Sequence, residues 1–356
     1  MKISVFDKYL GYNVGGAQKS LHALLKESKL EYHFFGCNVV KSFSAYKHKI
    51  DGFNVKRINI IEISRFPYIE YFLNRRRAIK FIRTIKSDIL ITQGMWGAIA
   101  ARFFKGKVIY FIRDEYHFNE LPVYQKGIKK ILKYIYLLVQ LPFILIFFRD
   151  NKNGIKKVYR VISNSKYVSA EIERRFNRPS DVIYPIISVR DLLRVKLQED
   201  ERKYITCIGQ ELIKGREIVE KIAAEMTDLQ FMIVGRNILK PLKKNNILYF
   251  PWKDDVLDIY KKTKLLLIPS ICNEAFGRTA VEAISLSIPV IGSNKGGLVE
   301  VLDEKNLIKD VYDIQSWKDK ISFFLNKKNN IHNYRDKALL FDMENQIRFF
   351  NEILRQ

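Results

Sequence analysis

The chain has 356 residues, 47% of them hydrophobic, and carries a formal net charge of +24. This length predicts two domains of ordinary size, and the hydrophobic content excludes a disordered chain. The cysteines, Cys37, Cys207 and Cys272, form no C-x-x-C pair, which argues against a disulfide scaffold or a zinc module and favours a reducing compartment. The positive charge indicates an anionic partner. Since no zinc-finger spacing, RNP-like strand or basic zipper accompanies it, we expect no nucleic-acid partner.

The N-terminal half alternates between short apolar runs and helical patterns, which predicts a parallel sheet with helices on both faces. The first run lies close to Met1 with no apolar h-region or cleavage site behind it. We interpret it as a strand and not a signal peptide, and expect a cytoplasmic protein. The expected strands are Ile3–Phe6, Tyr32–Phe35, Val55–Ile60, Ile89–Thr92, Val108–Ile112, Val161–Ser163 and Val182–Tyr184, with helices at Ala17–Leu25, Tyr71–Ile85 and Ser165–Arg175.

Two glycines, Gly15 and Gly16, lie between the first strand and the first helix. Glycines at such a turn let the backbone approach a ligand with no Cβ in the way, although a plain tight turn explains them equally well. The full G-x-G-x-x-G fingerprint is absent, so the pair does not imply a dinucleotide.

An apolar run from Ile131 to Phe148 is flanked by basic residues. It is slightly shorter than the ~20 apolar residues of a membrane-spanning helix, and Pro142 is expected to break or kink it. We therefore expect a helix, or a kinked pair of helices, in the interface of an anionic membrane, which predicts peripheral attachment at the cytoplasmic face. A buried core helix with a basic edge and a true membrane span are the alternatives.

The polar segment 190–202 contains no apolar strand, and we interpret it as a linker between two domains. A second set of apolar runs follows it and predicts a second parallel sheet. These runs are Tyr204–Gly209, Phe231–Gly235, Ile247–Phe250, Leu265–Ile268 and Pro289–Gly292, and a last helical stretch covers Met343–Leu354.

Two carboxylates flank a helix start in the second set. The strand Leu265–Ile268 leads into a loop with Glu274, and Gly277 then begins a helix that holds Glu282 on its second turn. Ligands bind beyond the carboxyl ends of the strands in open α/β sheets, and a helix N-terminus there suits a phosphate. Alternatively, such a pair can be a helix-capping acid and a solvated surface charge.

This arrangement resembles the E-x7-E signature of the family 4 retaining glycosyltransferases, and Ile-Pro-Val-Ile-Gly-Ser at 288–293 and Gly-Gly-Leu-Val-Glu at 296–300 follow at the family's intervals. The resemblance implies the GT-B fold, in which two Rossmann-like, doubly wound parallel-sheet domains face a cleft. By the same resemblance, Glu274 would bind hydroxyls of the donor sugar, Glu282 the ribose, and the backbone of Phe276 and Gly277 the diphosphate.

The resemblance also implies a domain order. Residues 1–189 would bind the acceptor, 203–340 would bind a nucleotide sugar, and 341–356 would form a helix that crosses back onto the first domain.

Other site residues follow from the resemblance. Gly15 and Gly16 look like the family's Gly-Gly-Ala-Glu/Gln loop. In the second domain Gly209 and Lys214 match a strand, loop and cation that meet the diphosphate, but Gln210 stands where the family usually has an arginine, and Arg216 or Arg278 could replace it. After Val108–Ile112 the family often has a histidine; here Arg113, Asp114 and His117 are the candidates for contacts with the sugar or acceptor.

The function implied is transfer of a sugar, with retention, from a UDP or GDP sugar to a glycan or lipid-linked acceptor, with no cofactor. No D-x-D motif occurs, so we expect no metal ion. In such enzymes the leaving diphosphate helps to deprotonate the acceptor, and the protein contributes positioning and charge stabilisation. A catalytically degenerate GT-B protein that binds an anionic surface or glycan is the alternative, and an epimerase of the same fold is a lesser one.

Overall fold

The computed structural model describes residues 1–12, 15–39, 52–63, 65–113, 127–253, 255–326 and 332–356. These fall into two compact units, Met1–Ile186 with Ile347–Gln356 (unit 1) and Ile187–Gln346 (unit 2). The division precedes the expected linker at 190–202. It does so because that stretch begins with a helix that belongs to unit 2: Val189 is fully buried, and the Arg335 side chain donates a hydrogen bond to the Leu193 carbonyl.

Unit 1 contains a seven-stranded sheet in the order β3-β2-β1-β4-β5-β6-β7, and every pairing in it is parallel. The two apolar strands β1 and β4 are buried along their whole length, as the continuous apolar runs predict. The strands are β1 (Ile3–Phe6), β2 (Tyr32–Asn38), β3 (Val55–Asn59), β4 (Ile89–Gln93), β5 (Lys107–Ile112), β6 (Arg160–Ser163) and β7 (Asp181–Val182).

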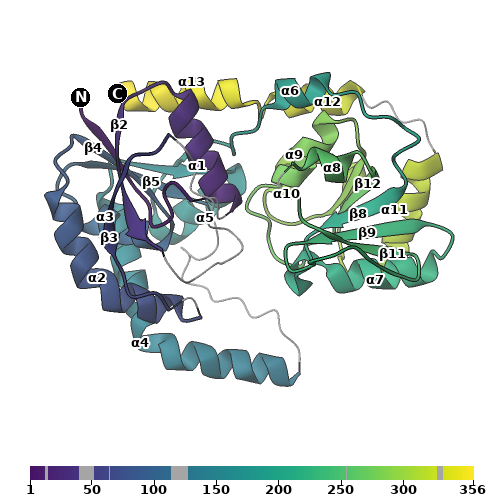
Figure 1. The fold of residues 1–356 in the computed structure, drawn as a ribbon, viewed down its shortest axis with the longest axis horizontal. Helices are drawn as coiled ribbons and strands as arrows, with labels where there is room; N and C mark the ends of the chain where they lie inside the picture. The colour runs from purple at the N-terminus through teal and green to yellow at the C-terminus, as the bar shows by residue number, and fades with distance from the viewer. Residues whose placement is uncertain (13–14, 40–51, 64, 114–126, 254, 327–331) are drawn as a thin grey trace. The chain divides into compact units, whose positions relative to one another are not determined.

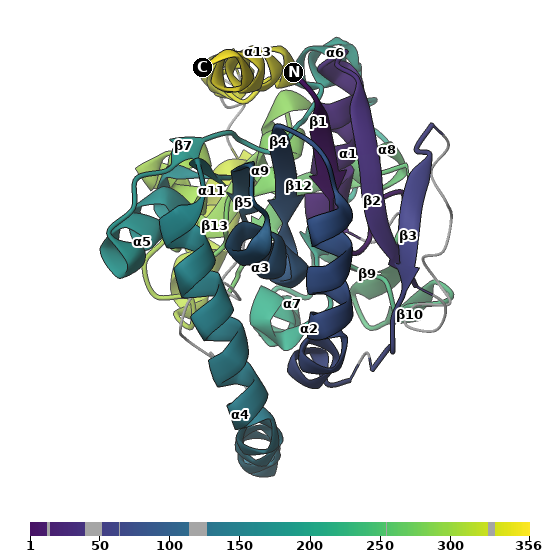
Figure 2. The same ribbon diagram turned by 90° about the vertical axis from the view of Figure 1, so that its left-hand side faces the viewer.

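Helices cover this sheet, and three of them, α2, α3 and α4, pack against one another (Figure 2). The last residues of the chain also belong to unit 1, where Phe350 of α13 is fully buried and contacts Phe111. The helices are α1 (Gly16–Glu27), α2 (Pro67–Thr84), α3 (Gly94–Phe103), α4 (Ile128–Lys157) and α5 (Lys166–Phe176), and α13 (Met343–Arg355) runs from unit 2 into unit 1.

The helix α4 runs without a break through Pro142, so the predicted break is absent, and the helix changes direction along its length (Figures 1 and 2). Within the described residues it is long and apolar enough to cross a membrane, by length and composition, and only 17% of its most apolar stretch is buried. It is therefore not the buried core helix that was one alternative for this segment. Its first half extends away from the rest of unit 1 (Figures 1 and 2).

Unit 2 contains a second seven-stranded sheet, in the order β10-β11-β9-β8-β12-β13-β14. Only β10 pairs antiparallel; it was not predicted because its residues are all exposed and follow no apolar pattern. The strands are β8 (Tyr204–Ile208), β9 (Gln230–Gly235), β10 (Leu242–Lys244), β11 (Ile247–Pro251), β12 (Thr263–Ile268), β13 (Val290–Ser293) and β14 (Leu307–Ile308).

The core of unit 2 lies between this sheet and its helices, with Trp317 and Phe231 fully buried in it. The packing fixes the carboxyl ends of β8 and β12, which carry the loops described below. The helices are α6 (Val189–Arg194), α7 (Arg216–Glu225), α8 (Leu257–Tyr260), α9 (Arg278–Ser285), α10 (Leu298–Val301), α11 (Ile314–Asn326) and α12 (His332–Leu339), with 3-10 turns η2 (Leu212–Lys214) and η3 (Glu304–Asn306).

Candidate functional site

A lysine and a glutamate predicted from the sequence meet in unit 2. Lys214 lies in η2 after β8, Glu274 lies in the loop after β12, and their Nζ and Oε1 atoms are 2.6 Å apart. The Ser270 hydroxyl also donates to Glu274 Oε1. Burial alone would lower the pKa of Lys214, but its interactions with Glu274, and with Cys272 and Glu211 after it, together outweigh that effect and the pKa is raised. Lys214 is thus a fixed, protonated cation at the carboxyl edge of the sheet.

Three glycines let the loops after β8, β12 and β13 approach one another more closely than any side chain would allow. A Cβ on Gly215, whose φ is +82°, would lie 2.0 Å from the Pro269 carbonyl oxygen. A Cβ on Gly296, whose φ is +59°, would lie 2.2 Å from the carbonyl oxygen of Glu274. The N–H of Gly297 donates to that same carbonyl at 2.6 Å. The backbone therefore sets the position of Glu274.

The helix α9 begins directly after Gly277, whose φ of +120° suits glycine alone and whose Cβ would lie 2.7 Å from Leu298. Its first N–H groups have no partner within the helix and carry the partial positive charge of the helix dipole. The Phe276 side chain is buried against Phe341, so only the backbone of Phe276 can serve an anion. This geometry fits the predicted diphosphate seat.

Glu282 occupies a more enclosed position than Glu274. Its side chain is 9% exposed, Oε1 accepts from Arg278 Nε at 2.7 Å and Oε2 accepts from the Tyr260 hydroxyl at 2.9 Å. Burial, and then the Glu282 charge, raise the pKa of Tyr260 well above its usual value, so the phenol stays a donor. A ribose would share Glu282 with these two side chains through the remaining lone pairs.

Gly209 and Gln210 follow β8 as predicted. Gly209 has a φ of +135°, and the Gln210 amide packs so closely on Gly235 that a Cβ there would lie 2.1 Å from its oxygen. The two arginines considered as replacements for the missing cation both have carboxylate partners. Arg216 bonds Glu220 at 2.8 Å, and Arg278 bonds Glu282.

Two predicted site residues of unit 1, Gly16 and Arg113, lie at the start of α1 and directly after β5. Gly16 begins α1, and a Cβ added to it would meet nothing within 4 Å, so packing does not require glycine there. Arg113 is buried, and its guanidinium donates to the Ala17 carbonyl of α1 at 2.9 Å. Asp114 and His117 lie outside the described residues.

The comparison with protein families decides the class of unit 2. Residues 190–340, which contain Lys214, Glu274 and Glu282, match the family described as Glycosyl transferases group 1. Residues 190–340 form a group 1 glycosyltransferase domain.

Curated relatives of the chain support this assignment of the group 1 domain. An uncharacterized 41.2 kDa protein in the cps region of Klebsiella pneumoniae is 27% identical over 49% of this chain and 57% of its own length. The uncharacterized glycosyltransferase MJ1178 of Methanocaldococcus jannaschii is 24% identical over 92% of this chain and 89% of its own. The O-antigen biosynthesis glycosyltransferase WclY of Escherichia coli is 30% identical over 37% and 36%. The chain thus spans about half the length of the first relative.

Solved structures show the fold of the whole chain. HepE of Anabaena, solved with UDP and glucose, matches with a TM-score of 0.68 and 15% identity over 100% of both chains. The lipopolysaccharide outer core galactosyltransferase WaaB, in its apo form, matches with a TM-score of 0.64 and 15% identity over 99% of both chains. Together with the two mostly parallel sheets, these matches show that the chain has the GT-B fold that the sequence predicted.

Sequence reasoning missed a polar cluster at the carboxyl edge of the other sheet, outside the group 1 domain. Asp7 follows β1, Gln93 ends β4, and both side chains are buried. Burial raises the pKa of Asp7 to about 6, although Gln93, Arg113 and Lys8 partly oppose the shift. Among the described residues, Asp7 Oδ2 accepts no hydrogen bond. The sequence signal for this cluster is a polar residue directly after each of two apolar runs.

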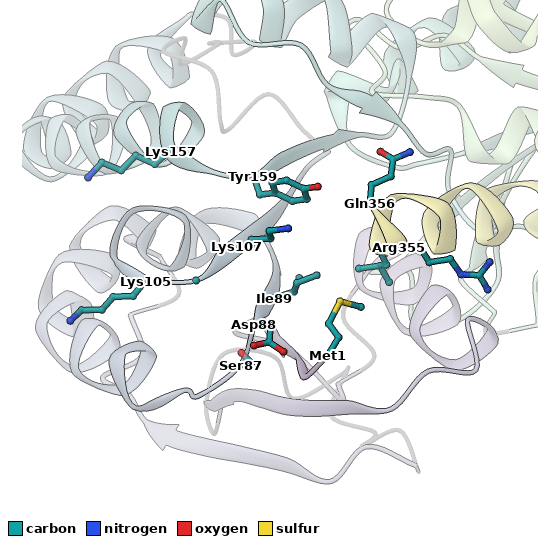
Figure 3. Close-up of a pocket in the computed structure, with 12 residues that line it drawn as sticks. Met1, Ser87, Asp88, Ile89, Lys105, Lys107, Lys157, Tyr159, Arg355 and Gln356 are labelled. Carbon is teal, nitrogen blue, oxygen red and sulfur yellow. The ribbon is translucent and has the colours of Figure 1, made fainter.

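A cavity of about 870 Å³ lies elsewhere in unit 1 (Figure 3). Asp88, Ile89 and Lys107 line it, at the amino ends of β4 and β5, so it opens at the edge of the sheet opposite Asp7 and Gln93. Ligands of open α/β sheets bind at the carboxyl edge, so a cavity at the opposite edge is not where a donor or an acceptor is expected. Separately, no three His, Cys, Asp or Glu side chains in the described ranges are grouped to hold a metal ion.

Proposed function

We propose that the chain is a glycosyltransferase that moves a sugar from a nucleoside diphosphate sugar, of the UDP or GDP class, to a glycan or lipid-linked acceptor, with retention at the anomeric carbon. One observation carries this proposal: Lys214 and Glu274 meet at 2.6 Å beside the N-terminus of α9, within a group 1 domain. That places a fixed cation, a hydroxyl-binding carboxylate and free helix N–H groups at one edge of one sheet.

In this reaction Lys214 and the N-terminal amides of α9 would meet the diphosphate as its bond to the sugar breaks. Charge then accumulates on the phosphate oxygens, and preformed donors stabilise it without reorganising. Glu274 holds Lys214 in place in the free protein. With the donor bound, its carboxylate would accept hydroxyls of the sugar, and Glu282 would accept those of the ribose.

We further propose that catalysis needs neither a metal ion nor a side-chain base. Lys214 supplies positive charge to the leaving group, and a leaving phosphate oxygen can take the acceptor proton on the same face of the sugar. Activity should therefore survive EDTA. Its loss on chelation, with recovery on adding manganese, would contradict this part of the proposal.

Comparisons with known proteins support the donor and acceptor classes. HepE was solved with UDP-glucose, and a trehalose-6-phosphate protein of E. coli with UDP-2-fluoro glucose, and both share the fold. WclY is named for O-antigen biosynthesis, and WaaB is a lipopolysaccharide galactosyltransferase. We propose a role in cell-surface polysaccharide or glycolipid assembly, at the cytoplasmic face of a membrane, with unit 1 binding the acceptor.

A catalytically degenerate protein is the second candidate, and Gln210 favours it because the expected arginine is missing and Arg216 and Arg278 are paired with carboxylates. Incubation with a panel of radiolabelled nucleotide sugars separates the two. Slow hydrolysis of one donor, lost in Glu274→Ala and kept in Glu217→Ala, a variant of an exposed residue of α7, is expected for the enzyme. Absence of hydrolysis and transfer with every donor would support the degenerate protein.

A further inference from the structure

The helix α4 is anchored to unit 1 chiefly by its C-terminal half. Asp150 is fully buried and accepts hydrogen bonds from Arg75 Nε at 2.6 Å and from the Tyr71 hydroxyl at 2.9 Å. By contrast, none of residues 128–139 is buried, and Gln140 is the first buried residue along the helix. The first three turns are therefore held out by the anchored half and not by a core of their own.

The side chains that this projecting half exposes are almost all apolar. At 100° per residue they occupy one half of the helix circumference, and the lysines of the same stretch, Lys129, Lys130 and Lys133, occupy the other half. We call the first half the apolar face. Its members, with 42–73% of each exposed, are Ile128, Ile131, Leu132, Tyr134, Ile135, Leu138, Val139, Leu141 and Leu145.

Beyond Leu145 the same side of α4 becomes cationic. Arg149, Lys152 and Lys156 are exposed and continue the line of the apolar face. The neighbouring helix α2 shows the same order, because its early exposed residues are Phe72 and Leu73 and the next exposed positions are Arg76 and Arg77.

The change from apolar to cationic falls at one level on both helices. Phe72 contacts Phe143 with ring centroids 5.0 Å apart, and Arg75 bonds Asp150. The apolar ends of α2 and α4 are therefore adjacent, and so are their cationic continuations. Such a shared boundary is what two neighbouring helices show at the level where hydrocarbon meets lipid headgroups.

We propose that the apolar face of α4, with Phe72 and Leu73 beside it, enters one leaflet of a membrane, while Arg149, Lys152 and Lys156 bind its anionic headgroups. The charge of α4 favours a membrane over a second copy of the chain as the partner of the apolar face. The only acid on α4 is Asp150, which is buried, so two copies meeting on this face would bring like charges together. A span would bury Lys129, Lys130 and Lys133, whereas a helix lying in the interface keeps them near water.

Vesicle binding tests the proposal without reference to catalysis. The full chain should sediment with vesicles of phosphatidylcholine and phosphatidylglycerol, bind phosphatidylcholine alone more weakly, and be released by high salt. Salt acts here because screening shortens the reach of the cations from about 10 Å at 0.1 M to about 3 Å at 1 M. No binding to either vesicle, or equal binding to both, would overturn the proposal.

Substitutions at exposed positions test the role of the apolar face in membrane binding without disturbing the fold. Exchange of Ile131, Leu138 and Leu145 for serine should lower the vesicle partition coefficient by about tenfold or more, because these side chains supply the buried apolar area. The matched control exchanges Leu239, Leu242 and Leu340, which like the test residues are each more than half exposed but lie in unit 2, and should bind like the wild type. An unaffected Ile131/Leu138/Leu145 variant would refute the assignment. The assignment would also be refuted if the wild-type chain is a dimer that this variant dissociates while vesicle binding stays unchanged.

A fluorescent label measures the depth of insertion. The native cysteines Cys37, Cys207 and Cys272 are all buried, so an introduced cysteine can be labelled selectively. An environment-sensitive dye on Leu138→Cys should shift to shorter wavelength with anionic vesicles, whereas the same dye on Lys129→Cys or Lys152→Cys should stay close to its aqueous spectrum. Equal spectral changes at Leu138 and Lys129 would show a span and contradict interfacial insertion.

Discussion

Asp7 keeps a charge in the core of unit 1 at a cost to stability, and Asp7→Asn should remove that cost. The carboxyl is 3% exposed, and burial raises its pKa from 3.8 to about 6 despite the opposing effects of Gln93, Arg113 and Lys8. A pKa that differs by one between the folded and unfolded chains corresponds to about 1.4 kcal/mol, so the ionised form destabilises the fold by about 3 kcal/mol.

The sign of the pH dependence follows from this raised pKa. Below pH 3.8 the carboxyl is protonated in the folded and unfolded chains, and the cost is absent. Between pH 3.8 and about 6 the unfolded chain has released its proton while the folded chain still holds it, so wild-type stability falls as the pH rises through this window and levels off above it. Asparagine resembles the neutral acid at every pH. The variant should gain about 3 kcal/mol at about pH 8 and almost nothing near pH 4.

Denaturant-dependent hydrogen exchange, read by mass spectrometry at several pH values, measures this gain in unit 1 separately from unit 2. Glu70→Gln is the matched control. Glu70 is equally buried but forms an ion pair with Lys8, so its neutralisation leaves a buried cation and should destabilise unit 1 by about 3–5 kcal/mol. A gain for Asp7→Asn that does not change with pH, or a loss near pH 8, would refute the reasoning.

Other substitutions test the candidate site. Lys214→Ala should lower donor kcat/KM by about 2–4 kcal/mol, the scale of one lost charge-stabilising group, and Lys221→Ala should leave it unchanged. Unaltered kinetics would remove Lys214 from the site. Glu282→Gln should mainly raise donor KM; a loss confined to kcat would argue against a ribose contact. Gly296→Ala should lower the Tm of unit 2 because its Cβ would collide with Glu274. Gly16→Ala should keep the Tm and lower activity; the reverse result would make Gly16 a structural glycine.

Much of the fold follows from local sequence, because buried parallel strands are continuous apolar runs. β1, β4 and β12 are examples, and all three lie where the runs predicted them. β10 and β14 were missed because all three residues of the first are exposed and the second has only two residues. The helix α4 continues through Pro142 without the break that was one expected outcome, because its C-terminal half is held by packing on unit 1.

The site was predictable only in part. Glu274 and Lys214 could each be named from motif spacing, but their ion pair joins residues 60 positions apart and depends on the close approach at Gly215 and Gly296. The raised pKa of Asp7 could not be predicted because it depends on burial by several strands at once.

Titration calorimetry of nucleoside diphosphates tests the central claim most directly. The wild-type chain should bind at least one of UDP, GDP and ADP without added metal, and Lys214→Ala should weaken that binding by about tenfold or more while Lys221→Ala does not. Failure of the wild-type chain to bind any nucleoside diphosphate, or equal affinity in Lys214→Ala, would contradict a donor site built on Lys214, Glu274 and the N-terminus of α9.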